Sequence, residues 1–293
     1  MTYRSWQPEH RPHRARLTRR GKRVLLLGGA LTVAAALTVS LLLVLGGEGA
    51  KRPAPEKRRT LLIPEGWRGG EVFAAVDRSL GLPVGTARRV AQTPATGLAL
   101  PPAAAGNPEG YLFPATYPVD RSTTPEALLR YMVDTAGKRF GTARIAEGAR
   151  RHGMSLHETV IIASIVQAEA DTPEVMGKVA RVVHNRLARG MPLQMDSTIN
   201  YALGRDTVDT TLQDTRIDSP YNTYERRGLP PSPIGNPGDQ AMSAAIAPAK
   251  GDWLYFVTVG PGDTRFTADY AEHLAHVAEF NERRRAAGSS ARS

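Results

Sequence analysis

The 293-residue sequence contains no cysteine, which excludes disulfide bonds and metal sites built from thiolates. It also lacks a G-x-S-x-G nucleophile turn, a G-x-x-x-x-G-K-[ST] phosphate loop and a G-x-G-x-x-G dinucleotide motif. The histidines beyond residue 100 show no metal-ligand spacing with carboxylates; they are His152, His157, His184, His273 and His276. The sequence therefore predicts neither a bound metal nor another cofactor.

Most of the chain carries no excess of positive charge, although the net charge is +10. Residues 1–59 hold 13 Lys and Arg but only three acidic residues, which accounts for the whole excess. The remaining chain is neutral, so we expect no basic face for nucleic acid in the folded part. The basic N-terminal arm alone could bind nucleic acid, but its place beside an apolar segment favours contact with lipid. We therefore expect no nucleic-acid partner.

One long apolar run is present, from Val24 to Leu45, with 22 residues and no charged side chain. As a helix it would span roughly 33 Å, which is enough to cross the hydrocarbon core of a bilayer. A buried helix of a soluble protein would carry polar residues on one face. A cleaved signal peptide would have a shorter apolar region and a small-x-small cleavage site, whereas residues 46–50 read GGEGA. The run therefore predicts a retained transmembrane helix over residues 24–45.

The basic residues around this run predict its orientation. Eight Lys and Arg precede the span and five follow it, and they are denser on the N-terminal side. The positive-inside rule then places segment 1–23 in the cytoplasm. We expect a single-pass protein of the cytoplasmic membrane, with the linker 46–59 and everything beyond it outside the cell. The basic residues of the linker can touch anionic lipid headgroups.

Residues 60–120 predict a small strand–helix–helix–strand subdomain. A short strand over 61–66 ends in a turn, and a helix over 71–80 is stopped by Gly81. A second short helix is expected over 84–91, followed by a loop rich in Ala, Pro and Gly. The aromatic segments 109–114 and 116–118 then predict a strand pair or an extended stretch.

Residues 121–285 predict a second domain of mixed helices and strands. Thr124-Pro125 and Thr172-Pro173 are helix starts, each with a capping hydroxyl followed by proline. Between them, Ser155 and Glu158 form a capping box in front of an almost wholly apolar helix. The chain is rich in loops from residue 192, and a strand over 254–259 and a helix over 270–285 complete the domain. The class is α+β, with residues 286–293 expected as a disordered tail.

Glu169 is the most unusual side chain of the apolar helix. In helical geometry it lies one turn from Ile165 and Val166, so its carboxylate shares a face with buried aliphatic side chains. Removal from water disfavours the ionised form and raises the pKa of such a carboxyl. A carboxylic acid that keeps its proton near neutral pH can protonate a leaving oxygen. The alternative is that the helix ends here and Glu169 points to water.

Other polar side chains have structural explanations as well as chemical ones. Glu158 belongs to the capping box, and Glu174 lies in the first turn of a helix, where the helix dipole favours an acid. Asp196 can cap a short helix that begins at Ser197. The tyrosines after residue 110 can line a sugar groove or pack as partly buried rings; they are Tyr111, Tyr117, Tyr201, Tyr221, Tyr224 and Tyr255 among others.

Several short segments occur in an order that resembles one family. They are Ile63-Pro64-Glu65-Gly66, Glu109-Gly110-Tyr111-Leu112-Phe113-Pro114, Ala163-Ser164-Ile165-Val166-Gln167-Ala168-Glu169, Asn185-Arg186-Leu187, Leu193-Gln194-Met195-Asp196-Ser197, Ser219-Pro220-Tyr221-Asn222-Thr223-Tyr224, Gly228-Leu229-Pro230-Pro231 and Asn236-Pro237-Gly238. Each segment alone is a weak signal, but together they cover roughly residues 60–280. The chain resembles the YceG-like (MltG) endolytic murein transglycosylases.

This resemblance implies a membrane anchor, a small LysM-like subdomain over 60–120 and a catalytic domain over 121–285. It implies lytic cleavage of the MurNAc–GlcNAc bond of peptidoglycan, which leaves a 1,6-anhydro-MurNAc end, in an enzyme that trims or terminates nascent glycan strands. Peptidoglycan synthases and the cytoplasmic membrane are the expected partners. A non-catalytic peptidoglycan-binding scaffold of the wall-synthesis machinery is the alternative, and the intact segment ending in Glu169 argues against it.

The resemblance also assigns residues. The catalytic glutamate of the family matches Glu169, and the second acid that some members carry two residues earlier is Gln167 here. The candidates for substrate contact or for positioning Glu169 are Gln194, Asp196, Tyr221, Asn222 and Tyr224. One departure concerns a histidine that the family often has two residues before Phe266, where this chain has Thr264. A later histidine of the family matches His273.

Overall fold

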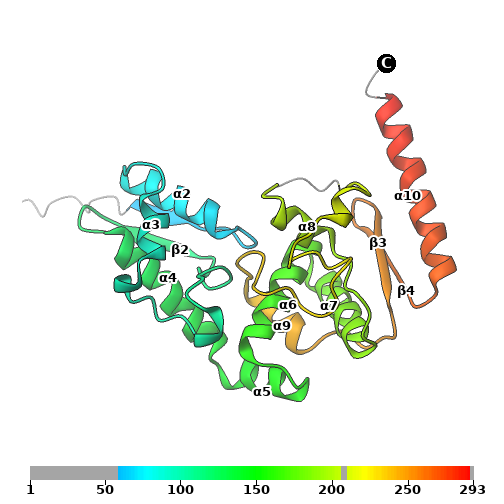
Figure 1. Cartoon of the computed structure of the whole chain (residues 1–293), viewed down its shortest axis with the longest axis horizontal. Coiled ribbons are helices and arrows are strands. Elements are labelled where there is room, and N and C mark those ends of the chain that lie inside the picture. Colours follow the sequence, from blue (N-terminus) through cyan, green and yellow to red (C-terminus); the bar gives the residue numbers. More distant parts are fainter. Residues whose placement is uncertain (1–58, 206–209, 291–293) are drawn as a thin grey trace, which may run out of the picture. The chain divides into compact units, whose positions relative to one another are not determined.

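The computed structural model describes residues 59–205 and 210–290, with side chains as far as residue 286. The predicted cytoplasmic segment, the predicted span 24–45 and all but the last residue of the linker lie outside the described residues. Among the helices of the described ranges, none is both long and apolar enough to cross a membrane. These ranges combine helices with small antiparallel sheets (Figure 1), so the predicted α+β class is confirmed.

The first elements follow the predicted order strand, helix, helix, strand. They are β1 (Arg59–Leu62), α2 (Gly69–Leu80), α3 (Thr86–Gln92) and β2 (Thr116–Val119). β1 pairs with β2 in antiparallel fashion, from Arg59 opposite Val119 to Leu62 opposite Thr116. Helix α2 ends where the sequence predicts, because Gly81 takes a left-handed φ of 67° that an L-residue adopts with strain.

Residues 109–114 are not a strand, so the expected strand pair with 116–118 is wrong. The segment is a run of turns in which the Tyr111 N–H donates to the carbonyl of Pro108 over 2.9 Å. Gly110 has a φ of 85°, and a Cβ there would lie 2.5 Å from Cγ of Pro233. The Leu112 N–H donates to Oδ1 of Asn236 rather than to a neighbouring strand. Partners far along the chain therefore decide the conformation of this segment, and β2 pairs with β1 instead.

The core of this half extends beyond residue 120. Helix α4 (Pro125–Phe140) begins as predicted, with the Thr124 hydroxyl accepting from the Ala127 N–H over 3.2 Å. Its buried side chains Leu128, Leu129, Met132 and Val133 share one apolar cluster with Ile63 of the β1 end, Val72 and Val76 of α2, and Tyr117 of β2. The four elements of the predicted subdomain thus bury their apolar side chains against α4.

The second half is helical and is arranged around α6. Its elements are α5 (Ala143–Arg151), α6 (Leu156–Glu169), α7 (Pro173–Ala188), α8 (Asp196–Ala202), the single turn η3 (Asp214–Arg216) and α9 (Asp239–Ile246). Both arms of the predicted capping box are present at the start of α6, between Ser155 and Glu158. Residues 159–166 of α6 are buried on every side, and α6 contacts α5, α7, α8 and α9 (Figure 1). The sequence did not predict α5 or α9.

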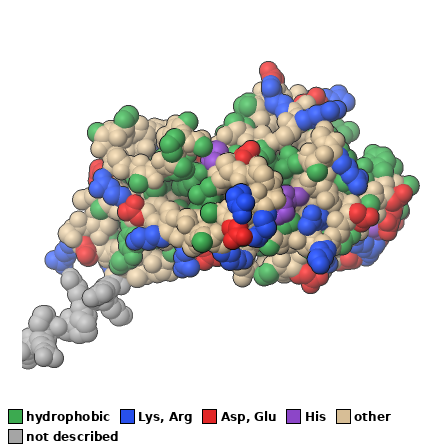
Figure 2. Space-filling view, turned by 90° about the horizontal axis from the view of Figure 1, so that it is seen from below, with side chains coloured by type: hydrophobic (Ala, Val, Ile, Leu, Met, Phe, Trp, Pro, Cys, Tyr) green, Lys and Arg blue, Asp and Glu red, His purple; other side chains and the backbone are tan. Residues whose placement is uncertain are grey.

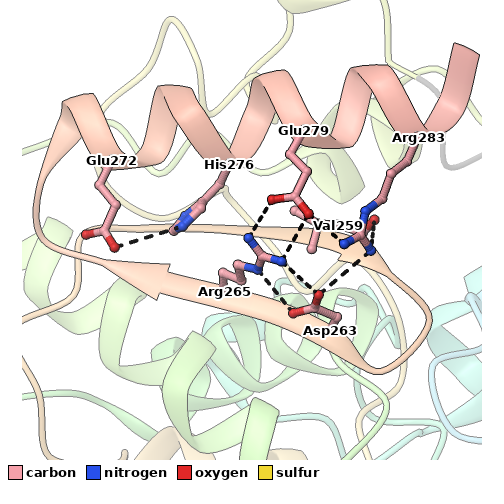
Figure 3. A network of polar contacts seen from close by, with 7 residues as sticks. All are labelled: Val259, Asp263, Arg265, Glu272, His276, Glu279 and Arg283. Carbon is pink, nitrogen blue, oxygen red and sulfur yellow. Dashed lines mark hydrogen bonds and ion pairs between the residues drawn. The ribbon is translucent and has the colours of Figure 1, made fainter.

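A hairpin and one long helix complete the described chain. Strand β3 (Tyr255–Gly260) pairs with β4 (Asp263–Thr267), and α10 (Tyr270–Ser290) packs along β3. Figure 3 shows the polar network between them: the guanidinium of Arg265 bridges Asp263 and Glu279, and Arg283 pairs with the same Glu279. Exposed ion pairs stabilise little singly, but a shared guanidinium fixes the direction of the helix. α10 runs to Ser290, so the prediction of a disordered tail from residue 286 is wrong for residues 286–290.

Charges of both signs are interspersed on the surface. On the face drawn in Figure 2, Lys and Arg side chains are mixed with Asp and Glu side chains. This distribution agrees with the neutral balance expected for the chain beyond residue 59.

Candidate active site

Glu169 is the last residue of α6, where the buried helix reaches the first turn of α8. Its Oε1 accepts a hydrogen bond from the Ser197 N–H over 3.3 Å. Burial raises the pKa of Glu169; the hydroxyl and N–H of Ser197 oppose the rise, and the nearby Asp196 carboxylate adds to it. The side chain is half-buried, so the alternative that it simply points to water does not describe its surroundings.

Asp196 and Tyr224 form a second polar pair beside Glu169. The Tyr224 hydroxyl donates to Oδ1 of Asp196 over 2.5 Å. Burial raises the pKa of both groups, and the charge of Glu169 contributes to the rise at Tyr224. Asp196 is the first residue of α8, but its carboxyl makes no capping bond, so the capping alternative is wrong. Glu169, Asp196 and Tyr224 thus lie in one electrostatic cluster.

The segment that carries Asp196 is held in an unusual conformation. Gln194 is exposed and has a φ of 51°, a left-handed conformation that is rare for a residue with a side chain. Its N–H donates to the Thr223 carbonyl over 2.9 Å, and the next N–H, of Met195, donates to the Thr223 hydroxyl over 3.0 Å. These bonds join the loop segment of Gln194 to the loop segment that carries Tyr221, Asn222 and Tyr224.

Arg186 of α7 binds the segment around Gln194, and the sequence analysis did not give it a role of its own. It is only 6% exposed, and its Nη1 donates to the Leu193 carbonyl over 2.7 Å and to Oε1 of Gln194 over 3.2 Å. Its Nε donates to the Leu254 carbonyl, just before β3, over 2.6 Å. The guanidinium also lies 5.2 Å from the ring centre of Tyr255. The buried cation therefore ties the candidate site to the β3–β4 hairpin.

Tyr221 and Asn222 differ in what they can contact. Asn222 is fully buried; its amide group donates to the carbonyls of Thr215 and Ile217, and its Oδ1 accepts from the Tyr224 N–H. Asn222 therefore cannot contact a substrate directly; it fixes the conformation of the loop and so has a positioning role. Tyr221 is half-buried, and its ring packs 4.9 Å from that of Tyr201 at the far end of α8.

The residues at the family's histidine positions lie on the hairpin and on α10. The Thr264 hydroxyl bonds to that of Thr258 across the β3–β4 pair over 2.9 Å, so the residue in the place of the absent histidine has a local partner. His273 stacks on the ring of Tyr255 at 5.0 Å between centres. Arg186 covers the same tyrosine, so His273 is joined to the candidate site through Tyr255.

Glu109 is a further buried acid that the sequence did not single out by chemistry. It is 7% exposed and accepts from the Gly69 N–H over 2.9 Å, from the Asn236 amide over 3.3 Å and from the Tyr201 hydroxyl over 3.3 Å. Burial raises its pKa to about 7, against the opposing effects of the Gly69 N–H, Tyr201 and Arg68. Its only sequence signal is its place in the segment 109–114. It lines a cavity of about 540 Å³ together with Phe73 and Arg88 among other residues.

Three of the family-like segments meet at Asn236, which is fully buried. Its carbonyl accepts from the Gly66 N–H over 2.8 Å, its N–H and amide donate to the Trp67 carbonyl, and its Oδ1 accepts from the Leu112 N–H. Next to it, Gln167 accepts from the Gly238 N–H over 3.0 Å. Gln167, which stands where some members of the family have a second acid, therefore binds the backbone next to Asn236.

No group of three or more histidine or acidic side chains within the described ranges is arranged to hold a metal ion. A second cavity, of about 720 Å³, lies by the N-terminal end of α6, with Glu158, His152 and His184 in its lining. Glu169 is at the other end of that helix, roughly 16 Å away along its axis. The polar residues described above therefore gather at the C-terminal end of α6, apart from this cavity.

Comparisons with known proteins agree with the resemblance. The model of the YceG-like family matches residues 36–279. A protein of Bacillus subtilis 168 named endolytic murein transglycosylase is 39% identical over 166 residues, which cover 56% of this chain and 46% of that protein. A protein of the same name from Streptococcus pneumoniae D39 is 37% identical over 177 residues, covering 58% of this chain and 32% of that protein. The chain thus spans less than half the length of these curated relatives.

A solved structure supports the fold as well. The 2.6 Å crystal structure of a yceG-like protein from Listeria monocytogenes superimposes with a TM-score of 0.67 and 31% sequence identity. The match covers 74% of this chain and 75% of that one. The family model spans most of the sequence, and the fold is shared with a solved relative at this identity. The chain belongs to the YceG-like family.

Proposed function

We propose that this chain is a membrane-anchored endolytic lytic transglycosylase that cleaves the MurNAc–GlcNAc bond of peptidoglycan. The observation that carries the proposal is the surroundings of Glu169. This carboxyl has a raised pKa, ends a buried helix and faces an N–H donor at the start of α8. The names of the relatives, which are endolytic murein transglycosylases, support the same reaction class.

The two states of Glu169 suit two successive proton transfers. In the protonated state, which burial favours, Glu169 gives its proton to the glycosidic oxygen as the bond to C1 of MurNAc breaks. The resulting carboxylate accepts from the Ser197 N–H and takes a proton from the C6 hydroxyl of the same MurNAc. The C6 oxygen bonds to C1, which gives the 1,6-anhydro end and returns Glu169 to its protonated state.

A single carboxyl is sufficient for this reaction. Glycosidases that use water place two carboxylates across the bond. Here the nucleophile belongs to the substrate, and an intramolecular group reacts without a second residue to activate water. Gln167 points to the Gly238 N–H, so within the described residues it stays outside this exchange.

The neighbouring residues have two kinds of proposed role. Gln194, Asp196, Tyr221 and Tyr224 are the candidates for contact with the glycan, because each side chain is partly or fully exposed. Asp196 and Tyr224 lie near Glu169, and Gln194 and Tyr221 belong to the two segments that carry them. Asn222 is proposed as a positioning residue, because its buried amide holds the loop that carries Tyr224. The bond between Tyr224 and Asp196 fixes the orientation of both side chains toward the substrate.

The organisation of the whole chain remains part of the proposal. Residues 24–45 would anchor the protein in the cytoplasmic membrane, with 1–23 inside the cell and the folded part outside. Residues 60–120 would form a LysM-like glycan-docking part, and 121–285 the catalytic part. Such an anchor places the enzyme where new glycan emerges, so trimming or terminating nascent strands beside peptidoglycan synthases is the proposed role. The strand–helix–helix–strand order of 60–120 supports the docking assignment.

The test is the chemistry of the new chain ends. Purified full-length chain is incubated with uncross-linked glycan strands, and the products are analysed by mass spectrometry. We expect internal cuts that leave 1,6-anhydro-MurNAc ends, which lack the mass of one water relative to reducing ends. Reducing ends would show a hydrolase instead. Retention of glycan without any cut, under conditions in which a relative from the same family cuts, would show a binding scaffold.

A further inference from the structure

Glu109 holds together three parts of the chain that lie far apart in sequence. Its Oε1 accepts from the Gly69 N–H at the start of α2 and from the amide of Asn236 before α9. Its Oε2 accepts from the Tyr201 hydroxyl of α8. The Gly69 N–H and the Asn236 amide nitrogen can only donate, and the Tyr201 hydroxyl donates to the ionised carboxyl, so the carboxylate accepts from all three partners at once.

Helix α8 connects Glu109 to Glu169. Ser197 and Tyr201 are four residues apart and therefore lie on the same face of α8. At one end of this face the Ser197 N–H donates to Glu169, and one turn later the Tyr201 hydroxyl donates to Glu109. Two acids, the half-buried Glu169 and the buried Glu109, thus bind the two ends of a seven-residue helix.

At that end of α8 the Tyr201 hydroxyl has two polar partners, the Glu109 carboxylate and the hydroxyl of Ser232. The ring of Tyr201 lies between the ring of Tyr221, at 4.9 Å, and the guanidinium of Arg68, at 5.4 Å. Arg68 also donates to the Asn200 carbonyl over a long 3.4 Å. Ring contacts of this kind permit sliding and rotation, whereas a hydrogen bond to a fixed carboxylate sets the position of the hydroxyl.

An acid at this place has both a use and a cost. A buried carboxylate is costly when it is charged, whereas an amide of the same shape would avoid the charge but could accept at only one of the two oxygens where Glu109 accepts. The charged and titratable groups that face Glu109 are Arg68 and Glu71 at the start of α2, Arg88 of α3 in the shared cavity lining, and Tyr201 of α8. Arg68 lowers the cost of the charge, and Glu71 raises it.

We propose that Glu109, as a carboxylate, is a positioning residue for the reaction at Glu169. By holding Tyr201 it fixes α8, and α8 presents the Ser197 N–H that stabilises the Glu169 carboxylate between the two proton transfers. This inference rests on the proposed function. Protonation of Glu109 turns the charge-assisted bond from the Tyr201 hydroxyl into a weaker neutral bond, in which the carboxylic O–H donates to the Tyr201 oxygen, so α8 is held less firmly.

The arrangement predicts which acid controls which side of the pH–rate profile. Burial raises the pKa of Glu109 to about 7, so the carboxylate that holds α8 is lost as the pH falls through that region. Glu169 must be protonated to begin the reaction, so its ionisation lowers the rate on the alkaline side. Ionisation of Glu109 therefore controls the acid limb of the pH–rate profile, and ionisation of Glu169 controls the alkaline limb.

The kinetic test uses full-length Glu109→Gln and Tyr201→Phe. Glutamine at 109 is neutral at every pH and resembles the protonated acid. We expect kcat to fall roughly tenfold to a hundredfold, as for a misplaced catalytic group, with KM changed less than about twofold, and the acid limb to disappear. Tyr201→Phe keeps the ring but removes the donor, so it should give the same loss, and the double variant should lose no more than either single one.

The matched control is Glu71→Gln. It removes a nearby negative charge that also faces Glu109, but its partner is the Arg68 N–H, which glutamine binds equally well in a capping box. We expect it to keep both kcat and the acid limb. An unchanged kcat and an unchanged acid limb in Glu109→Gln would overturn the proposal, and so would an equal effect in Glu71→Gln.

A second measurement does not depend on activity. In full-length chain with ¹⁵N-labelled serine and with Glu169→Gln, the Ser197 amide signal can respond only to groups other than Glu169. We expect it to shift with an apparent pKa near 7, and the shift to vanish when Glu109→Gln is added. A Ser197 amide that does not titrate there contradicts the coupling. If the wild-type chain cuts no glycan while this titration is seen, the proposed function fails and the link between the two acids stands.

Discussion

Glu169→Gln should lower the rate of glycan cleavage by roughly a thousandfold, the range expected when a general acid–base group is removed. Glutamine keeps the shape of the side chain, and its oxygen can still accept from the Ser197 N–H. It has no proton acidic enough for the glycosidic oxygen and no basic oxygen for the C6 hydroxyl, so both proton transfers fail together. The measurement is the rate at which 1,6-anhydro ends appear on uncross-linked strands.

The activity of Glu169→Gln should fall without any decrease in the free energy of unfolding. Because the pKa of Glu169 is raised by folding, its ionised form costs stability, and this cost grows as the pH rises through the folded-state pKa. The variant should therefore unfold at an equal or higher denaturant concentration on the alkaline side. Glu174→Gln, an exposed acid in the first turn of α7, serves as the control and should keep full activity. A rate for Glu169→Gln within tenfold of the wild type would rule out this residue as the acid.

Arg186→Met should give the second large effect, this time on both stability and activity. The substitution leaves the buried carbonyls of Leu193 and Leu254 without their donor. Hydrogen bonds from a charged group to buried acceptors contribute strongly, so we expect a loss of about 3 kcal/mol in the free energy of unfolding. For a chain of this size that corresponds to a fall of roughly 10 °C in Tm. Differential scanning calorimetry measures it directly.

The activity of Arg186→Met should fall as well, because Gln194 loses the donor that holds its side chain. Arg186→Lys tests the geometry: lysine keeps the charge, but its single nitrogen cannot reach acceptors on both sides of a planar guanidinium. We expect it to recover only part of the stability. Arg189→Met, an exposed arginine just after the same helix, is the control for lost charge and should be close to wild type. Equal stability of Arg186→Met and Arg189→Met would show that the buried bonds contribute nothing.

The elements that could be predicted are those whose signals are local. Caps at Thr124, Ser155 and Thr172 mark three helices because a capping hydroxyl needs only the next turn of its own chain. Helix α5 has the same kind of local signal, because the Thr142 hydroxyl accepts from the Ile145 N–H, and the sequence prediction missed it, whereas α9 has no side-chain cap. They meet where Gly148 lies so close to Ile246 that a Cβ would be 2.6 Å from the Cβ of the isoleucine. A contact of this kind is defined only after the chain has folded.

The residues of the candidate site also divide into those with a local sequence signal and those without one. Glu169 could be found because it ends the apolar helix α6 within one turn of Ile165 and Val166, and the resemblance to a family strengthened the assignment. Arg186 and Glu109 could not be recognised as buried, since arginine and glutamate are usually exposed and their partners lie on other segments. Glu109 finds its donors at 69, 201 and 236, separations that no sequence window covers. The roles of these residues follow from contacts between distant segments.

Asn236 has a consequence for the order in which the protein folds. Its partners lie 124 residues away at Leu112 and 169 residues away at Trp67, so these bonds close very large loops and must form late. During synthesis the segments around Gly66 and Leu112 lack these partners until Asn236 has been added to the chain. Pulse-labelled hydrogen exchange should show the amides of Gly66, Leu112 and Asn236 gaining protection in one slow phase. The half that contains β1 to α4 and the half that contains α5 to α10 would then fold as one kinetic unit.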